Sequence, residues 1–277
     1  MTSSAKEVAR RAIDPLGWHS VRPLDLDALA RARAEMMNLM QWLARIANSY
    51  VPAGPPEGRL FLEYRPADAT FITKPFGRNL ALALHMPTLE MQFHEHKKAV
   101  PHTFDPEERS PAEAEAWLLV ELLHRGIDRA KFSKELPYNI PGLMTGDATD
   151  HSPQSCQQAL TQLTAWFRKA AAILDATAWT SDAGQACIVC WPQTLSLSCA
   201  SNIGSTRLDA GFSPGDAQNP EPYFYRGRLA SNGSGVGKGR SILTASELLA
   251  VSDPAATVFA FLTTADVTPA GLGFYVD

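Results

Sequence analysis

Residues 60–95 read LFLEYRPADATFITKPFGRNLALALHMPTLEMQFHE, and this stretch decides the predicted fold class. It divides into apolar runs over 60–64, 70–73, 80–85 and 89–95, separated by the turn-like segments RPAD, KPFGRN and MPT. In the last run Leu89, Met91 and Phe93 alternate with polar residues, which is the two-residue period of a strand with one buried face. We therefore expect several short antiparallel strands here.

A helical pattern precedes these strands. Apolar residues recur every three or four positions over 26–46, and Asp25 or Asp27 is suited to cap the start of the helix. The segment PAGPPEG, residues 52–58, ends it, because proline cannot continue the hydrogen-bond ladder.

Similar signals recur along the rest of the chain. Ser110 and Pro111 predict a helix over 110–126 with a capping box, and Ser152-Pro153 predicts the start of a third helix. A last helix is expected from about 252 to 264. Further strands are expected over 185–191, 195–201, 206–212, 223–227 and 273–276, with a glycine-rich loop at 231–241.

Each half of the chain thus runs helix, strands, helix. This order predicts an α+β fold with one or two mainly antiparallel sheets and four or five packed helices. Two similar α-β-α lobes, related by duplication, are an alternative description. The predicted parts are an extended segment 1–23, a first lobe 24–134, a connecting loop 135–153 and a second lobe 154–277, together in one compact domain.

Composition narrows the classes of function. The chain has 277 residues, 45% of them hydrophobic, and a formal net charge of −4, so its overall charge does not attract nucleic acid or acidic membranes. Four cysteines are too few for a disulfide scaffold. The N-terminus lacks the apolar stretch of a secretory signal, and no window is apolar enough to span a membrane. We expect a cytoplasmic protein.

Five blocks of the chain resemble a bacterial family of uncharacterised proteins, a domain of unknown function. The family pattern contains LHxWxQIVGK, FxFxxH, HxxYD, a strand with WG, and GFxPG before an FY pair. The matching positions are Gln41–Arg45, Met91–His96, His151–Gln154, Trp191-Pro192, and Gly211–Gly215 with Phe224-Tyr225. Met37 and Ala44 depart from the first block. The resemblance implies a shared fold and brings no known activity.

The most distinctive segment is GFSPGD at 211–216, followed by three consecutive aromatic residues at 223–225. Such a segment could line a pocket for a small polar or amphipathic molecule, or its rings could pack in the core. Residues expected near this ligand pocket are His96, His151, Trp191, Asp216, Tyr223 and Tyr225.

A metal site is an alternative. His94 and His96 are two positions apart on a predicted strand, so both imidazoles would lie on one face, with Glu90 or Gln92 as a further ligand. Such a site would suit a metal-dependent hydrolase or oxygenase. The competing interpretation is a solvated strand face that runs into the basic residues Lys97 and Lys98.

His151 precedes a predicted helix start, with Asp147 and Asp150 nearby. A histidine at a helix N-terminus is disfavoured as a cation and could serve as a base, or it could be an ordinary loop residue. The sequence therefore leaves three classes open: a small-molecule-binding protein, a metal-dependent enzyme, and a structural or homo-oligomerisation module. It names no particular cofactor.

Overall fold

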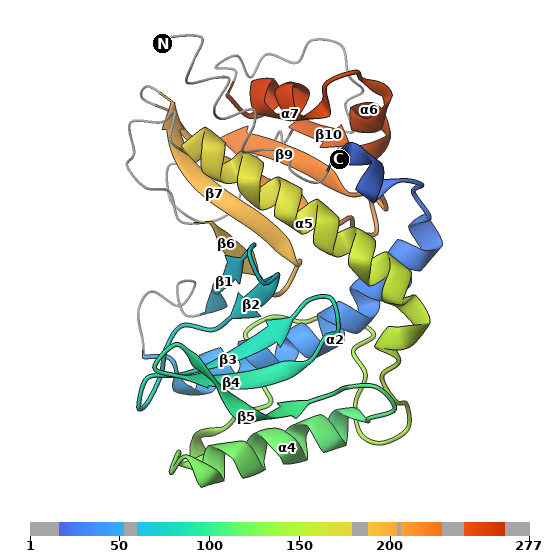
Figure 1. Ribbon diagram of the computed structural model, residues 1–277. Coiled ribbons are helices and arrows are strands. Elements are labelled where there is room, and N and C mark those ends of the chain that lie inside the picture. The colour runs from blue at the N-terminus through green and yellow to red at the C-terminus, as the bar shows by residue number, and fades with distance from the viewer. Residues whose placement is uncertain (1–16, 53–59, 179–187, 204–205, 229–240, 264–277) are drawn as a thin grey trace.

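The structure is a computed structural model that describes residues 17–52, 60–178, 188–203, 206–228 and 241–263 (Figure 1). The first half of the chain comprises η1 (Trp18–Val21), α2 (Leu26–Tyr50), β1 (Leu62–Arg65), β2 (Thr70–Ile72), β3 (Leu80–His85), β4 (Met91–Glu95), β5 (Lys98–Phe104), α4 (Pro111–His124) and η2 (Arg129–Lys131). The second comprises η3 (Pro153–Cys156), α5 (Gln157–Ala178), β6 (Val189–Trp191), β7 (Ser196–Ile203), β8 (Thr206–Ser213), β9 (Tyr223–Arg228), β10 (Ser241–Thr244), α6 (Ala245–Ala250) and α7 (Pro254–Thr263).

All ten of these strands form one antiparallel sheet in the order β10-β9-β8-β7-β6-β1-β2-β3-β4-β5. Each half contributes a five-stranded meander, and the two meanders join where β1 pairs with β6, Leu62 opposite Cys190. The predicted α+β class is confirmed. The order helix, five strands, helix occurs in both halves, while their origin by duplication stays a prediction.

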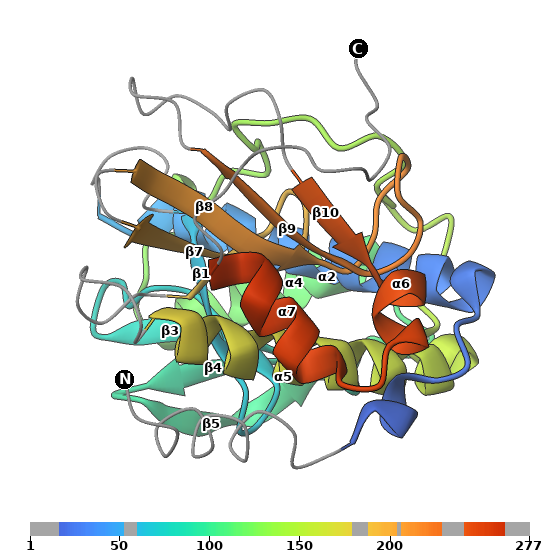
Figure 2. The ribbon, with the colours of Figure 1, turned by 90° about the horizontal axis from the view of Figure 1, so that it is seen from above.

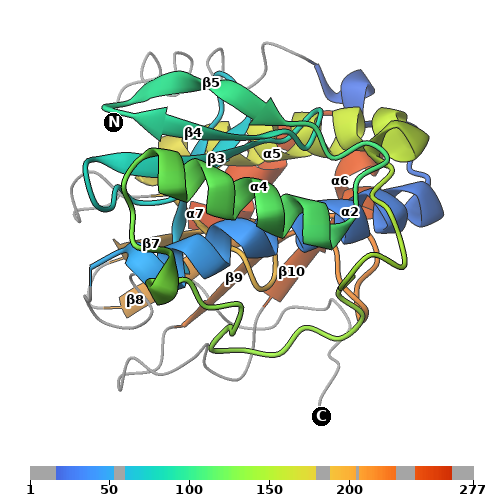
Figure 3. The ribbon, with the colours of Figure 1, turned by 90° about the horizontal axis from the view of Figure 1, so that it is seen from below.

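Helices α2 and α5 pack against each other and against strands of their own halves, β3 for α2 and β7 and β8 for α5. Figures 2 and 3, seen from above and below, show both helices running between the strands of the first half and those of the second. Buried side chains from both halves form one hydrophobic cluster. Phe167 of α5 lies at the junction, with its ring against Tyr64, Phe71 and Phe212.

The helix starts follow the local chemistry of the sequence. Asp25 caps α2 by accepting a hydrogen bond from the Ala28 amide at 2.9 Å. Ser110 caps α4 and exchanges capping-box bonds with Glu113, as predicted. None of the described helices is both long and apolar enough to cross a membrane.

The predicted start of the third helix is wrong in detail. The Ser152 side chain makes no capping bond, and its hydroxyl donates to Glu107 instead. Residues Pro153–Cys156 form a 3-10 turn, so α5 begins at Gln157.

Strand β5 was not predicted, because it carries Pro101 and is largely exposed, so it lacks the alternation of a half-buried strand. Strand β10 and α6 were also missed, although Thr244 and Glu247 form a capping box at the start of α6. Residues 231–240 and the predicted strand 273–276 lie outside the described residues.

Candidate functional site

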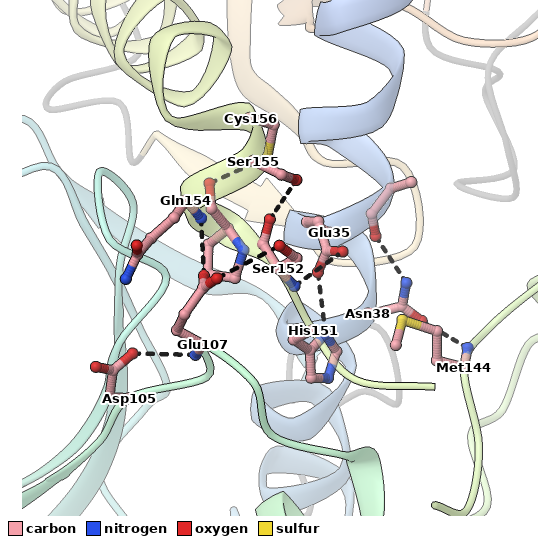
Figure 4. Close-up of polar contacts among 12 residues, drawn as sticks. Glu35, Asn38, Asp105, Glu107, Met144, His151, Ser152, Gln154, Ser155 and Cys156 are labelled. Carbon is pink, nitrogen blue, oxygen red and sulfur yellow. Dashed lines mark hydrogen bonds and ion pairs between the residues drawn. The ribbon is translucent and has the colours of Figure 1, made fainter. Parts of the chain in front are cut away.

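The most unusual polar feature of the described chain is a buried histidine paired with a carboxylate. His151 is 1% exposed, and its Nδ1 lies 3.0 Å from Oε2 of Glu35 on α2 (Figure 4). The main chain holds the residue in place, because the His151 amide donates to Arg109 O and the His151 carbonyl accepts from the Glu108 amide. A loop residue and a helix residue 116 positions apart are thereby fixed as a dyad.

The carboxylate selects the form of the imidazole. An ionised glutamate only accepts hydrogen bonds, so Nδ1 carries the proton and Nε2 keeps its lone pair in the neutral ring. Nε2 is buried and has no hydrogen-bond partner among the described residues. Leaving a buried acceptor unpaired costs about 1–3 kcal/mol. This atom can accept a hydrogen bond or a proton from a bound molecule.

His151 also lines a surface hollow beside α2. The hollow is a shallow depression that is partly open to solvent. Its other lining residues are Asn38, Trp42, Arg45, Pro111, Leu143 and Met144. In Figure 4 one nitrogen of the His151 ring points to Glu35 and the other is turned away from it. The hollow therefore combines an aromatic side chain, a cation and an imidazole.

Arg45 supplies the cation. Its guanidinium carbon lies 4.5 Å from the centre of the Trp42 ring, and its Nε donates to Lys134 O at 3.0 Å. Within the part of the chain that is described, no carboxylate forms an ion pair with it. Burial lowers the pKa of Arg45, with Glu115 acting in the opposite direction. Of the guanidinium nitrogens of Arg45, only Nε donates a hydrogen bond to the described residues, so the terminal nitrogens can donate to an anion.

The loop that closes the hollow is fastened to α2. The Met144 amide donates to Asn38 Oδ1 at 2.7 Å, and the Tyr138 hydroxyl donates to Gln41 Oε1 at 2.9 Å. Burial raises the pKa of Tyr138, so this hydroxyl remains a donor. Gln41 in turn donates to Pro192 O of the second half at 2.9 Å. These bonds hold the wall of the hollow against both halves of the fold.

A second set of polar contacts supports the His151 segment from the other side. Glu107 accepts hydrogen bonds from the Gln154 amide at 2.9 Å and from the Ser152 hydroxyl at 3.4 Å (Figure 4). Nearby Cys156 is buried, which raises its pKa to about 11, so it is a protonated core thiol at neutral pH. This network fixes the chain that leads from His151 into α5.

Asp147 and Asp150 are close to His151 in the sequence, but neither forms a hydrogen bond or ion pair with its imidazole among the described residues. Asp147 accepts a hydrogen bond from the Ser110 hydroxyl at 3.1 Å, and Asp150 is exposed. The carboxylate at the imidazole belongs to Glu35, which the sequence does not place near His151.

The residues of the predicted aromatic segment, 211–225, do lie close together, but their polar groups form hydrogen bonds with one another. The Tyr223 hydroxyl donates to Asp216 Oδ2 at 2.6 Å, and Asp216 Oδ1 accepts from the amides of Gln218 and Asn219. Tyr223 and Tyr225 are buried, with ring centres 6.4 Å apart. None of these residues lines the hollow beside α2. Their contacts support the core-packing alternative for this segment.

Trp191 and His96 are also not among the residues that line the hollow. The Trp191 indole donates to the Ser198 hydroxyl at 2.8 Å and contacts the ring of Phe61. His96 is exposed in the turn between β4 and β5. Of the six residues predicted near the ligand pocket, only His151 lines this hollow.

The predicted metal ligands are not assembled. Strand β4 ends at Glu95, and His96 and Lys97 form a two-residue turn with φ values of 51° and 67°, so His96 is not on the strand face with His94. Glu90 accepts a hydrogen bond from the Thr88 hydroxyl. Across the described ranges, no group of three or more His, Cys, Asp and Glu side chains could hold a metal ion.

His94 has a consequence for stability. Burial, reinforced by the charge of Arg65, lowers the pKa of His94, so the folded state binds its proton less tightly than the unfolded chain does. The resulting contribution to stability is complete above the ordinary histidine pKa of about 6.5 and is lost as the pH falls below it. We expect His94→Gln to reduce the pH dependence of the unfolding free energy between about pH 7 and pH 5. Chemical denaturation at each pH measures this, and equal slopes in wild type and variant would contradict the assignment.

Sequence reasoning missed most of the residues around the hollow. Glu35, Asn38, Trp42 and Arg45 follow one another at spacings of three, four and three, which places them on one face of α2. This row of polar and aromatic side chains beside the apolar face of the helix is the pattern from which the sequence could have predicted a site here. The partner histidine lies too far along the chain for any local pattern to find it.

The chain has no counterpart in three comparisons: no family model, no curated protein and no solved structure matches it.

Proposed function

We propose that the protein binds a small hydroxycarboxylate in the hollow beside α2. The observation that carries this proposal is the His151 Nε2 atom, a buried acceptor with no partner in the described chain, on a ring oriented by Glu35. A buried acceptor in this position favours a ligand that supplies the missing donor.

The carboxylate of the ligand is assigned to Arg45. The terminal nitrogens of this guanidinium make no hydrogen bond within the described residues and suit the two oxygens of a carboxylate, and partial burial strengthens this interaction relative to an exposed one. Trp42 holds the guanidinium by stacking against it, so little side-chain freedom is lost when the ligand binds.

The hydroxyl of the ligand is assigned to His151. Its hydrogen would be donated to Nε2, while Nδ1 keeps its bond to Glu35 and the tautomer is unchanged. Pro111, Leu143 and Met144 form the apolar part of the lining. Because the hollow is shallow and partly open to solvent, it favours a ligand of only a few carbon atoms.

Calorimetric titration with glycolate tests this assignment. Glycolate carries both groups, whereas acetate lacks the hydroxyl and ethylene glycol lacks the carboxylate. We expect glycolate to bind at least about tenfold more tightly than either, because a hydrogen bond to the charged Arg45 is worth about 1.5–3 kcal/mol and leaving the buried Nε2 of His151 unpaired costs about 1–3 kcal/mol.

Two arginine variants make a matched pair. Arg45→Met is expected to weaken glycolate binding at least about tenfold, because it removes the cation and keeps the length of the side chain. Arg31→Met changes an exposed arginine on the same helix that does not line the hollow, and it is expected to leave the affinity unchanged. Equal effects of the two variants, or equal binding of glycolate and acetate, would refute the proposal.

The proposed setting is the cytoplasm, with a small solute rather than nucleic acid or a membrane as the partner. The net charge of −4 supports this part of the proposal. The resemblance to an uncharacterised bacterial family remains a prediction.

A further inference from the structure

Helix α4 carries an apolar stripe on its outer face. Ala116, Leu119, Val120 and Leu123 follow the i, i+3, i+4, i+7 spacing of one helix face. Val120 is 46% exposed and Leu123 is 52% exposed. Figures 1 and 3 show α4 at the lower surface of the molecule, with no helix or strand on its outer side.

The side chains of this stripe do not contribute to the packing of the hydrophobic core. The inner face of α4 already packs through Ala114, Leu118 and Leu122, while the Trp117 ring lies against Phe93 and Phe104. Within the described residues, the only other large hydrophobic side chain with comparable exposure is Val251, which is isolated after α6. Single exposed apolar residues are ordinary, whereas a contiguous stripe on one helix indicates an interaction surface.

We propose that this stripe docks against the same stripe of a second copy of the chain, with the two α4 helices antiparallel across a twofold axis near Leu119 and Val120. Such an axis pairs each position with its counterpart on the other side of the helix centre. Ala116 of one copy then faces Leu123 of the other, a small residue against a large one, and Leu119 faces Val120.

The polar side chains beside the stripe are complementary in the same register, because a carboxylate can accept a hydrogen bond from an imidazole N–H. On a helix with 100° per residue, Glu113 and His124 lie on the same flank, next to Val120, and at opposite ends of α4. The twofold axis therefore places Glu113 of one copy opposite His124 of the other. Both side chains are exposed, at 44% and 60%, and Glu113 also accepts hydrogen bonds from Arg109 and from the Ser110 amide within its own chain. A parallel arrangement would place like side chains opposite each other, which favours the antiparallel one.

The area of the α4 stripe determines how tightly the two copies are expected to associate. A helix of 14 residues is about 21 Å long, and a stable interface buries about 800 Å² on each partner, more than one four-residue stripe supplies. We therefore expect a reversible dimer that dissociates in the micromolar range, at about 1–100 µM. This inference is independent of the proposed ligand.

Sedimentation velocity from about 1 to about 200 µM tests the proposal. The wild-type protein is expected to shift from mostly monomer to mostly dimer, and Leu123→Glu is expected to raise the dissociation constant at least about tenfold. Val251→Glu introduces the same charge at an exposed apolar residue outside the stripe and is expected to leave the dimer intact. A monomer at every concentration, or equal weakening by both variants, would overturn the proposal.

Cross-linking tests the antiparallel register. Ala116→Cys and Leu123→Cys proteins, mixed and oxidised, are expected to give a disulfide between residue 116 of one copy and residue 123 of the other, identified by mass spectrometry. Disulfides that form only between identical positions would contradict the antiparallel pairing. Both side chains are exposed, so we expect the two cysteine variants to fold. A far-UV circular dichroism spectrum like that of the wild type checks this.

Discussion

Replacing Phe167 with alanine is expected to lower the free energy of unfolding by about 3–5 kcal/mol, the usual range for removing a fully buried phenylalanine. The Phe167 ring lies 5.7 Å from Tyr64 and 5.4 Å from Phe71, both in the first half, and 5.3 Å from Phe212 in the second, measured between ring centres. Its loss would leave a cavity where the two meanders share their core. The denaturation midpoint in urea measures the effect.

The same variant tests whether the two halves unfold together. Since their buried side chains form one cluster, we expect hydrogen-exchange protection to fall in both β3 and β8 when Phe167 is truncated. Phe167→Leu keeps most of the volume and is expected to cost about 1–2 kcal/mol as a matched control. Loss of protection confined to one half would contradict a shared core.

Gly211→Ala is expected to destabilise the fold by about 3 kcal/mol or more, because overpacking against backbone cannot be relieved by a rotamer change. A β-carbon at this position in β8 would overlap the carbonyl oxygen of Leu197 on β7 and the ring of Tyr225 on β9. The close approach of these neighbours explains the glycine in the GFSPG segment. Thermal or urea unfolding measures the loss.

Gly142→Ala is the matched control. Gly142 has a φ of 76°, and an added β-carbon would have no neighbour within 4 Å. Its replacement is therefore expected to cost only the conformational strain of an alanine with positive φ, about 1–2 kcal/mol. If the two alanine variants were equally stable, tight packing would not be the reason for glycine at position 211.

Much of the fold could be predicted from the sequence, because its signals are local. The capping residues Asp25 and Ser110 act at the predicted helix starts, and the alternation of Met91 and Phe93 matches the buried face of β4. Strand β5 escaped prediction because edge pairing depends on backbone hydrogen bonds and leaves no apolar pattern.

Less of the candidate site could be predicted, because its residues are far apart in the sequence and come together only through tertiary contacts. His151 was recognised as a candidate, but its carboxylate, Glu35, comes from a helix 116 positions earlier. Tyr223 and Asp216 were correctly placed near each other, yet their hydroxyl and carboxylate bind one another instead of facing a ligand. The sequence shows which polar groups are present, whereas the structure shows which of them already have hydrogen-bond partners within the protein.

The protonation and ligand response of His151 test the central claim most directly. Nitrogen NMR of the histidine side chains is expected to show the Nδ1–H tautomer for the neutral form of the His151 ring, because Nδ1 donates to Glu35. Adding glycolate is expected to shift the Nε2 signal while Nδ1 stays protonated. A ring protonated at Nε2 alone, or a His151 signal that saturating glycolate leaves unmoved, would contradict the assignment of this hollow as a ligand site.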